Sequence, residues 1–346
     1  MRVTFARLFA FSLLPLAALF AACAEGTPRA VDPTVVRDAT VSALAWKAED
    51  AAAVALLDGA ILDATISDAG TDGSLRDAAA PRLELPRGGT EFFPTYRLVG
   101  YCGTPGGPAL GPLLGDLGAK TKKMMKQAEP YAEGRKIMPV FELIAVIVMS
   151  TPGQDQKYRR RISTSVVDDY LKAAREAKGI LLLNIQPGKA DFLGEIQHFE
   201  KYLRMPDVGV AIDPEWSVRG KQTPGVYYGQ TTGAIINTLA AYLSKLVQEN
   251  NLPEKALVFH QLNRHVVKDE NVIVPPPGVA IIKSVDGLGP KGSKLVTYKD
   301  LMKLRTPGVH PGFKLFFDED TKNGGKLMTA KEVLALQPEP EYVMYE

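Results

Sequence analysis

The chain has 346 residues, of which 46% are hydrophobic, enough for one large core or two modest ones. Its formal net charge of +2 provides no basic footprint for nucleic acid, so we expect no nucleic-acid partner. The two cysteines are Cys23 and Cys102. If Cys23 is modified, Cys102 stands alone and no disulfide framework exists, and we expect Cys102 to be a small buried hydrophobe.

The N-terminus has the pattern of a secretory signal peptide. Arg2 and Arg7 form a basic start, residues 8–22 are mostly apolar, and polar residues come soon after them. Residues 19–23, Leu-Phe-Ala-Ala-Cys, resemble a bacterial lipobox, which implies that Cys23 is lipidated and holds the protein at the cell envelope; Phe20 stands where that motif prefers Leu. The alternatives are ordinary cleavage, which leaves an extracellular protein, and an uncleaved anchor.

Residues 24–90 differ in composition from residues 91–346. They are rich in Ala, Asp and Gly, and aspartates recur about every five residues, as in low-complexity segments. These aspartates are Asp58, Asp63, Asp68, Asp72 and Asp77. Such a segment buries too little apolar surface to offset chain entropy, so we predict a tether. Whether it packs on the domain after it stays open.

From residue 91 onward, apolar runs alternate with helical patterns, which is typical of βαβ units. We predict strands at 97–101, 136–144, 180–185, 208–212, 256–260, 279–283, 313–317 and 342–345. We predict helices at 113–127, 191–203, 232–249, 294–304 and 329–336, and one after the polar loop 151–163 whose apolar face is Val166, Val167, Tyr170, Leu171 and Ala174. Eight strands in this length predict a (β/α)8 (TIM) barrel that lacks a final helix. The alternative is an open doubly wound α/β sheet, against which no Gly-x-Gly-x-x-Gly opens the first helix.

Polar side chains gather where the predicted strands end, and barrel enzymes place their sites there. These residues are Tyr101, Glu142, Asn184, Gln186, Asp213, Glu215, His260, Gln261, Asp286, Asp318 and Asp320. Trp216 and Tyr228 lie in the loop after Glu215. A rim of carboxylates, amides and aromatic rings suits a carbohydrate, because rings stack on sugar faces and polar groups bind hydroxyls. The alternative is that strand ends are polar only because loops are polar.

Glycosidic cleavage needs a proton donor for the leaving oxygen and a second carboxylate. Glu215 is the candidate donor, because Asp213 two residues earlier raises its pKa by like-charge repulsion. Asp286 or Asp318 is the candidate nucleophile or base. We expect neither a cofactor nor a metal, although acidic oxygens of this kind suit Mg²⁺ or Ca²⁺.

The remaining polar and aromatic candidates are assigned to substrate binding. They are Tyr101, Glu142, Asn184, Gln186, Trp216, Tyr228, His260 and Gln261.

Residues 209–216 are similar to the fourth-strand motif of chitinase-type glycosidases, Gly-apolar-Asp-apolar-Asp-x-Glu-aromatic. The resemblance implies that Glu215 is the acid and that Asp213 assists it. This chain has Ala211 where the motif has its first Asp, and Pro214 where it has an aromatic residue. More broadly, residues 139–144, 186–192, 213–216 and 259–261 resemble a family of secreted, largely actinobacterial proteins, which implies the barrel and export but no activity.

Three functional hypotheses remain. The first is a glycoside hydrolase acting on cell-wall or extracellular glycans. The second is a carbohydrate-binding barrel without turnover, which Ala211 favours. The third is a metal-dependent phosphodiesterase of the glycerophosphodiester type, although Tyr101-Cys102-Gly103 stands where that enzyme needs a His-Arg pair. The expected partners are a glycan or small polar ligand, and a membrane only through the lipid.

Overall fold

The computed structural model describes residues 82–346 of the chain. The predicted signal peptide, Cys23 and most of the predicted tether lie outside these residues.

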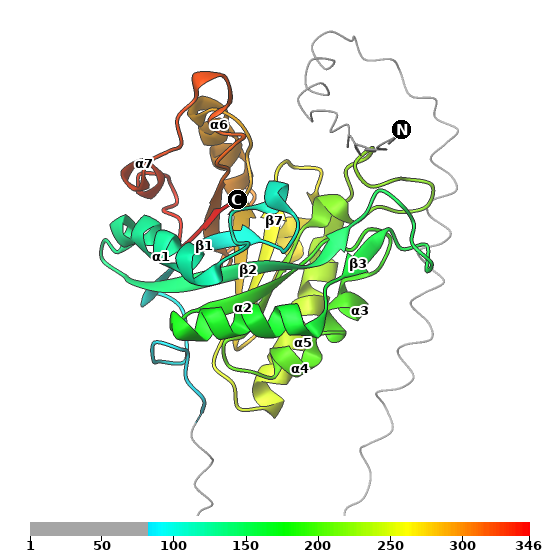
Figure 1. Cartoon of the computed structure of the whole chain (residues 1–346), viewed down its shortest axis with the longest axis horizontal. Coiled ribbons are helices and arrows are strands. Elements are labelled where there is room, and N and C mark those ends of the chain that lie inside the picture. The colour runs from blue at the N-terminus through cyan, green and yellow to red at the C-terminus, as the bar shows by residue number, and fades with distance from the viewer. Residues whose placement is uncertain (1–81) are drawn as a thin grey trace, which may run out of the picture. The chain divides into compact units, whose positions relative to one another are not determined.

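Eight parallel strands close into a barrel (Figure 1). They are β1 (Tyr96–Gly103), β2 (Lys136–Val148), β4 (Ile180–Ile185), β5 (Val208–Ile212), β7 (Lys255–Gln261), β9 (Val279–Val285), β10 (His310–Leu315) and β11 (Tyr342–Tyr345). Their order in the sheet is their order in the chain, and β1 pairs with both β11 and β2. The predicted (β/α)8 barrel is confirmed, and the open doubly wound sheet is wrong, because the first and last strands meet.

Helices connect most of the strands. They are α1 (Leu117–Ala128), α2 (Thr164–Glu176), α3 (Phe192–Gln197), α4 (Glu200–Leu203), α5 (Gly233–Glu249), α6 (Lys291–Met302) and α7 (Ala330–Leu334). The helix predicted at 191–203 is two short helices, α3 and α4. Between β7 and β9, the described connection contains a 3₁₀ turn in place of an α-helix.

Shorter elements complete the described chain. The 3₁₀ turns are η3 (Pro108–Leu110), η4 (Glu129–Tyr131), η5 (Pro214–Trp216), η6 (Glu270–Val272) and η7 (Lys322–Gly324). Strand β3 (Arg159–Arg161) runs antiparallel to the end of β2, and β6 (Thr231–Thr232) pairs with β8 (Val267–Lys268). Pairing with β3 explains why β2 continues four residues beyond its predicted end.

Strand register decides which side chains face the barrel interior, because residues paired across a sheet share a face and successive residues alternate. His260 of β7 pairs with Ser284 of β9, and Cys102 of β1 pairs with Glu142 of β2. His260 and Glu142 meet across the interior at 3.1 Å, so both pairs face inward. Their neighbours Tyr101 and Gln261 must therefore face outward.

The strand β10 begins and ends earlier than predicted, at His310 and Leu315 instead of 313 and 317. His310-Pro311-Gly312 reads as a turn in the sequence, because Pro and Gly are rare inside strands. Here Pro311 and Gly312 lie near the start of the strand, where a missing N–H is tolerated. Within this strand Lys314 lies on the inward face, and residues 316–320 belong to the turn after it.

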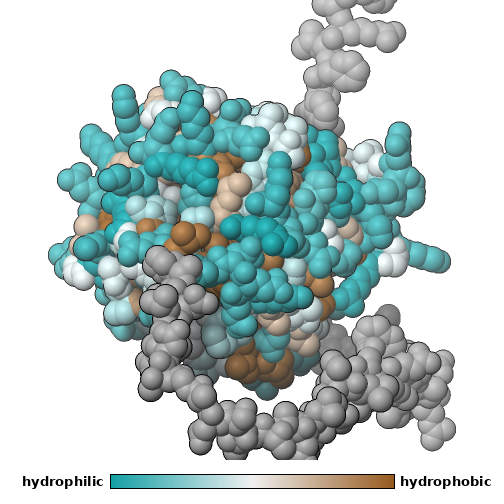
Figure 2. All heavy atoms as spheres, turned by 90° about the horizontal axis from the view of Figure 1, so that it is seen from below, coloured by the Kyte–Doolittle hydropathy of each residue, from teal (hydrophilic) through white to brown (hydrophobic). Residues whose placement is uncertain are grey.

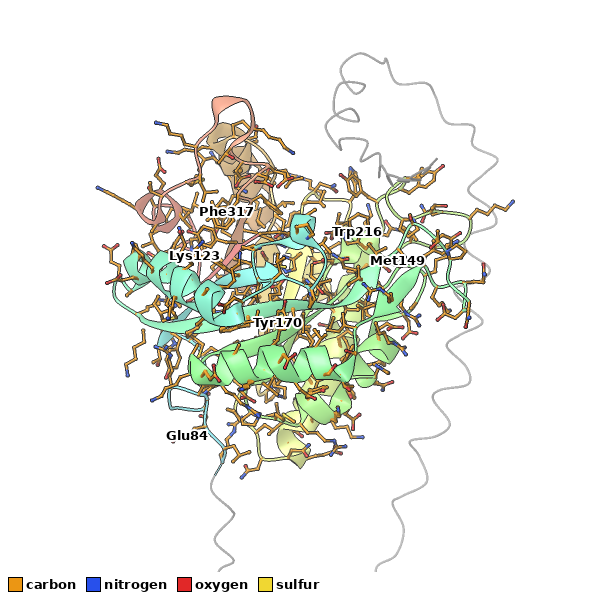
Figure 3. All side chains as sticks on the ribbon, viewed as in Figure 1. Glu84, Lys123, Met149, Tyr170, Trp216 and Phe317 are labelled. Carbon is orange, nitrogen blue, oxygen red and sulfur yellow. The ribbon has the colours of Figure 1, made fainter. Side chains whose placement is uncertain are left out.

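The first described residues cover the N-terminal ends of the strands. Leu83 N and Arg82 Nε donate to the carbonyls of Asn251 and Leu252, just before β7. The Arg87 guanidinium donates to the carbonyls of residues 177 and 178, just before β4. In Figure 3, Glu84 lies at the bottom of the view, whereas Trp216 and Phe317, which come after the ends of β5 and β10, lie in its upper half. Residues 82–90, assigned to the tether by sequence, thus pack on the barrel.

The surface of the described chain is mostly polar. Seen from below, hydrophilic residues cover most of the face, and hydrophobic residues appear in scattered areas (Figure 2). None of the helices described between residues 82 and 346 has the length and apolar character that crossing a bilayer requires.

We predict that Gly100→Ala destabilises the barrel where β1 meets β2. A Cβ at Gly100 would lie 1.9 Å from the carbonyl oxygen of Val140, so β1 has to move away from its partner. Overpacking of this kind costs about 1–3 kcal/mol, and a backbone obstacle places the cost at the upper end. Urea unfolding measures it. Gly292→Ala in α6 is the control, because no atom lies within 4 Å of its Cβ and alanine favours a helix. Equal stability of G100A and the wild type would contradict the prediction.

Candidate active site

A group of buried polar side chains fills the interior of the barrel at the C-terminal ends of the strands. We call it the interior cluster. Its members are Glu142, Asn184, Asp213, His260, Ser284, Asp286, Lys314 and Tyr342, and each is at most 5% exposed. They come from β2, β4, β7, β9, β10 and β11 and from the residues just after β5 and β9.

His260 is the centre of the interior cluster. Its Nδ1 lies 2.8 and 3.0 Å from the two carboxylate oxygens of Asp286, and its Nε2 lies 3.1 Å from Glu142 Oε1. Burial lowers the pKa of His260, but Asp286 and Glu142 outweigh it and raise this pKa well above its usual value. The imidazolium is therefore held as a buried cation between two anions.

The same contacts keep both acids ionised. Burial raises the pKa of Glu142, but His260, Lys314 and the hydroxyl of Tyr342, which donates to Glu142, lower it to about 2. Burial likewise raises the pKa of Asp286, but His260 and Lys314 lower it to about 2, together with a 2.8 Å hydrogen bond from Ser284.

Two amides hold Asp213. Asn184 Nδ2 donates to Asp213 Oδ1 at 3.1 Å and to Glu142 Oε1 at 3.0 Å, and Gln186 Nε2 donates to Asp213 Oδ2 at 2.9 Å. Both contacts of Asn184 need a donor, which fixes the orientation of its amide. Its Oδ1 is then a buried acceptor with no partner among the described residues.

Glu215 has a different environment from these acids. Pro214 opens the 3₁₀ turn η5, and Gly229 N donates to the carbonyl of Glu215 at 2.6 Å. The side chain is 8% exposed, and its Oε2 has no hydrogen-bond partner among residues 82–346. Burial raises the pKa of Glu215 well above its usual value, and the charges of Asp213 and Asp286 raise it further. The neutral, proton-carrying form of Glu215 is favoured.

Lys314 of the interior cluster and Glu346 beside it were both missed by the sequence analysis. Lys314 Nζ lies 2.6 Å from Glu346 Oε2 and 3.4 Å from Asp286 Oδ2. The signal in the sequence was a lysine inside the apolar run Phe313-Lys314-Leu315-Phe316, since a buried lysine requires a partner. Lys314 was overlooked because this strand was predicted to begin and end too late.

Among the predicted residues that lie outside the interior cluster are Tyr101, Gln261 and Asp318. Tyr101 faces outward, and its ring centre is 6.0 Å from those of Phe317 and Tyr345. Gln261 also faces outward, where its Nε2 donates to Glu270 Oε1 at 2.8 Å. Asp318 is exposed in the turn after β10, and its carboxylate forms no hydrogen bond or ion pair within the described chain. Of the two candidates for the second carboxylate, the structure brings Asp286 to Glu215.

The aromatic candidates lie at the edge of the cluster. Trp216 comes directly after Glu215 and is partly buried. Tyr228 is 47% exposed and lies near Glu215, because the next residue, Gly229, donates its N–H to the carbonyl of Glu215. Burial raises the pKa of the Tyr228 hydroxyl, and the charge of Glu215 contributes. Val226 and Tyr227 are exposed beside it.

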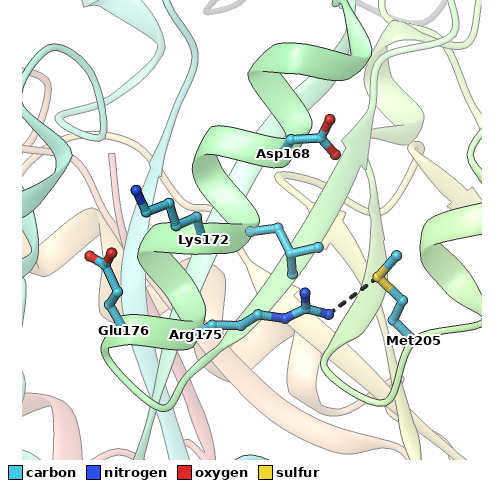
Figure 4. A pocket seen from close by; sticks show the side chains of 6 residues that line it. Asp168, Lys172, Arg175, Glu176 and Met205 are labelled. Atoms are coloured by element: carbon cyan, nitrogen blue, oxygen red, sulfur yellow. Dashed lines mark hydrogen bonds between the residues drawn. The ribbon is translucent and has the colours of Figure 1, made fainter.

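A hollow lies on the outer side of α2, away from the interior cluster (Figure 4). Its volume is about 320 Å³, and its lining consists of Asp168, Leu171, Lys172, Arg175, Glu176 and Met205. Arg175 is already paired with Asp207 at 2.6 Å, and none of the sequence candidates lines this hollow. For metals, no three His, Cys, Asp or Glu side chains between residues 82 and 346 are arranged to hold an ion.

We predict that His260→Gln lowers stability most at acidic pH. The folded-state pKa of His260 is raised above its unfolded value of about 6.5, so its stabilisation is complete below that pH and is lost as pH rises through the folded value. Removing one partner of a buried ion pair costs about 3–5 kcal/mol. Urea unfolding at pH 5.5 and pH 9 measures the gap in the free energy of unfolding between wild type and variant. His265 is exposed, so H265Q serves as the control. A gap that does not narrow at pH 9 would refute the assignment.

No protein-family model matches the chain, and a search of curated proteins found no match.

Proposed function

We propose that the protein is a glycoside hydrolase that acts on cell-wall or extracellular glycans, with Glu215 as the general acid. One observation carries the proposal. Glu215 is buried with an Oε2 that has no partner among the described residues, and its pKa is raised by burial and by the charges of Asp213 and Asp286, whereas the pKa of Asp286 is lowered to about 2. Two acids whose environments drive their pKa values apart are suited to act as acid and base in one reaction.

Each residue has a role in this reaction. Glu215 donates its proton to the glycosidic oxygen as the bond to the sugar carbon breaks. Asp286 stabilises the positive charge that develops on the sugar, either as the nucleophile or as the base that activates water. Asp213, fixed by Asn184 and Gln186, keeps the pKa of Glu215 high. Asn184 Oδ1 is free to accept a hydrogen bond from a sugar hydroxyl.

The location of the protein is part of the proposal. The basic start, the apolar run and the lipobox-like end at Cys23 support export and a lipid anchor at the cell envelope. A glycan substrate outside the cell fits this location.

A binding barrel without turnover is the second candidate, and one observation favours it. Ala211 of β5 is fully buried and pairs with Asn184, so the position of the motif's first carboxylate holds only a methyl group. In this alternative the interior cluster maintains the shape of a sugar site, and Glu215 only donates a hydrogen bond.

We predict that E215Q and D286N each reduce glycan cleavage, because general acid–base groups contribute about 100-fold or more. Release of reducing sugar from a panel of cell-wall and extracellular glycans measures the activity of the full chain. D318N changes an exposed acid outside the interior cluster, and its activity should remain within about twofold of the wild type, because surface changes away from a site have small effects.

The two candidate functions differ in the outcome. If the wild type and E215Q release equal, background-level product while both still bind glycan, the hydrolase is excluded and the binding barrel stands. If D318N is as inactive as E215Q, the choice of Asp286 is wrong.

A further inference from the structure

The proposed reaction uses Glu215, Asp213 and Asp286, but it gives no task to Lys314. This lysine has 4% of its side chain exposed and is the sole lysine with a described contact to Asp286. Its Nζ is closer to Glu346 than to Asp286, at 2.6 against 3.4 Å. One ammonium group therefore serves two carboxylates, and the shorter contact goes to the acid outside the reaction.

The groups around Asp286 come from several elements. His260 of β7 and Lys314 of β10 are cations in contact with it, and Ser284 of β9 donates to it. Glu215 of η5 and Glu346, after β11, each have a pKa that the charge of Asp286 raises. The charge of Asp286 also acts on the pKa of Lys294 of α6, but Lys294 Nζ is paired with Asp320 at 3.0 Å. Lys314 is thus the cation whose attachment to Asp286 is divided.

We propose that Lys314 is a positioning residue that holds Asp286 as an oriented carboxylate, and that Glu346 shares the ammonium of Lys314 with Asp286. The catalytic role of Lys314 rests on the proposed function, but its effect on the pKa of Asp286 requires no substrate. A protonated Asp286 neither attacks the sugar carbon nor activates water, so His260 and Lys314, which lower the pKa of Asp286, extend the reaction to lower pH.

Two substitutions separate positioning from simple structural support, because K314M and E346Q both break the Lys314–Glu346 pair. K314M removes a cation from Asp286, and the pKa of that acid must rise, since an opposite charge at this range lowers a carboxyl pKa by about 1–3 units. E346Q leaves Lys314 charged and free to move toward Asp286, so the pKa of Asp286 must not rise. A structural role predicts the same result for both variants.

The first test is the acid limb of the pH profile of kcat/KM for the full chain. We expect K314M to move this limb to higher pH by about one unit or more, and E346Q to leave it at or below the wild-type position. K314R keeps the charge and should restore the profile. K283M is the matched control, because Lys283 is a fully buried lysine paired with Glu270 on the outward face, at 2.5 Å. An equal upward shift in K283M or E346Q overturns the proposal.

The second test requires no activity, so it distinguishes failure of this inference from failure of the proposed function. Carbon-13 NMR of protein labelled at aspartate carboxyl carbons monitors the titration of Asp286, and D286N identifies its signal. Asp286 should protonate at higher pH in K314M than in wild type and E346Q, even if no glycan is cleaved. Coincident titrations in K314M and wild type overturn the inference. If K314M does not fold, K314Q, which still bonds Glu346, takes its place with the same expectation.

Discussion

The buried ion pairs of His260 with Glu142 and Asp286 are the constraint on which the site depends. The three residues come from β7, β2 and the end of β9, so their contacts cross the barrel interior. An isolated charge in the barrel interior is energetically unfavourable. Without its partners, each of the three residues would therefore become neutral. Charge balance therefore fixes how the strands carrying the acids stand relative to each other, and it orients Asn184, which donates to Glu142 and Asp213.

This balance also explains why neighbouring carboxylates differ in protonation. Glu142 and Asp286 have cations in contact, and Asp213 has two amide donors. Glu215 is also buried, and burial together with the charges of Asp213 and Asp286 raises its pKa well above its usual value, which favours the form that carries the proton. Neighbouring carboxyl groups in the barrel thus have lowered or raised pKa values, and the positions of one histidine and one lysine decide which.

The sequence predicted the strands well where they are apolar on both faces. The bounds of β4, β5 and β11 are as predicted, because continuous apolar runs are typical of parallel strands. Side-chain direction was harder to predict, since a strand end offers two consecutive residues that face opposite ways. His260 faces inward and Gln261 outward, and sequence alone assigned both to the site. Because the end of β10 was predicted too late, Asp318 was assigned to the site and Lys314 was overlooked.

The segment at residues 82–93 has a consequence for how the barrel is presented. It runs beneath the strands, fastened by Arg82 and Arg87 to the loops that precede β7 and β4. The chain therefore enters the domain at the pole opposite the interior cluster. Under the proposed lipid anchorage, the segment that connects the domain to its anchor therefore leaves the interior cluster and the loops around it uncovered by residues 82–93.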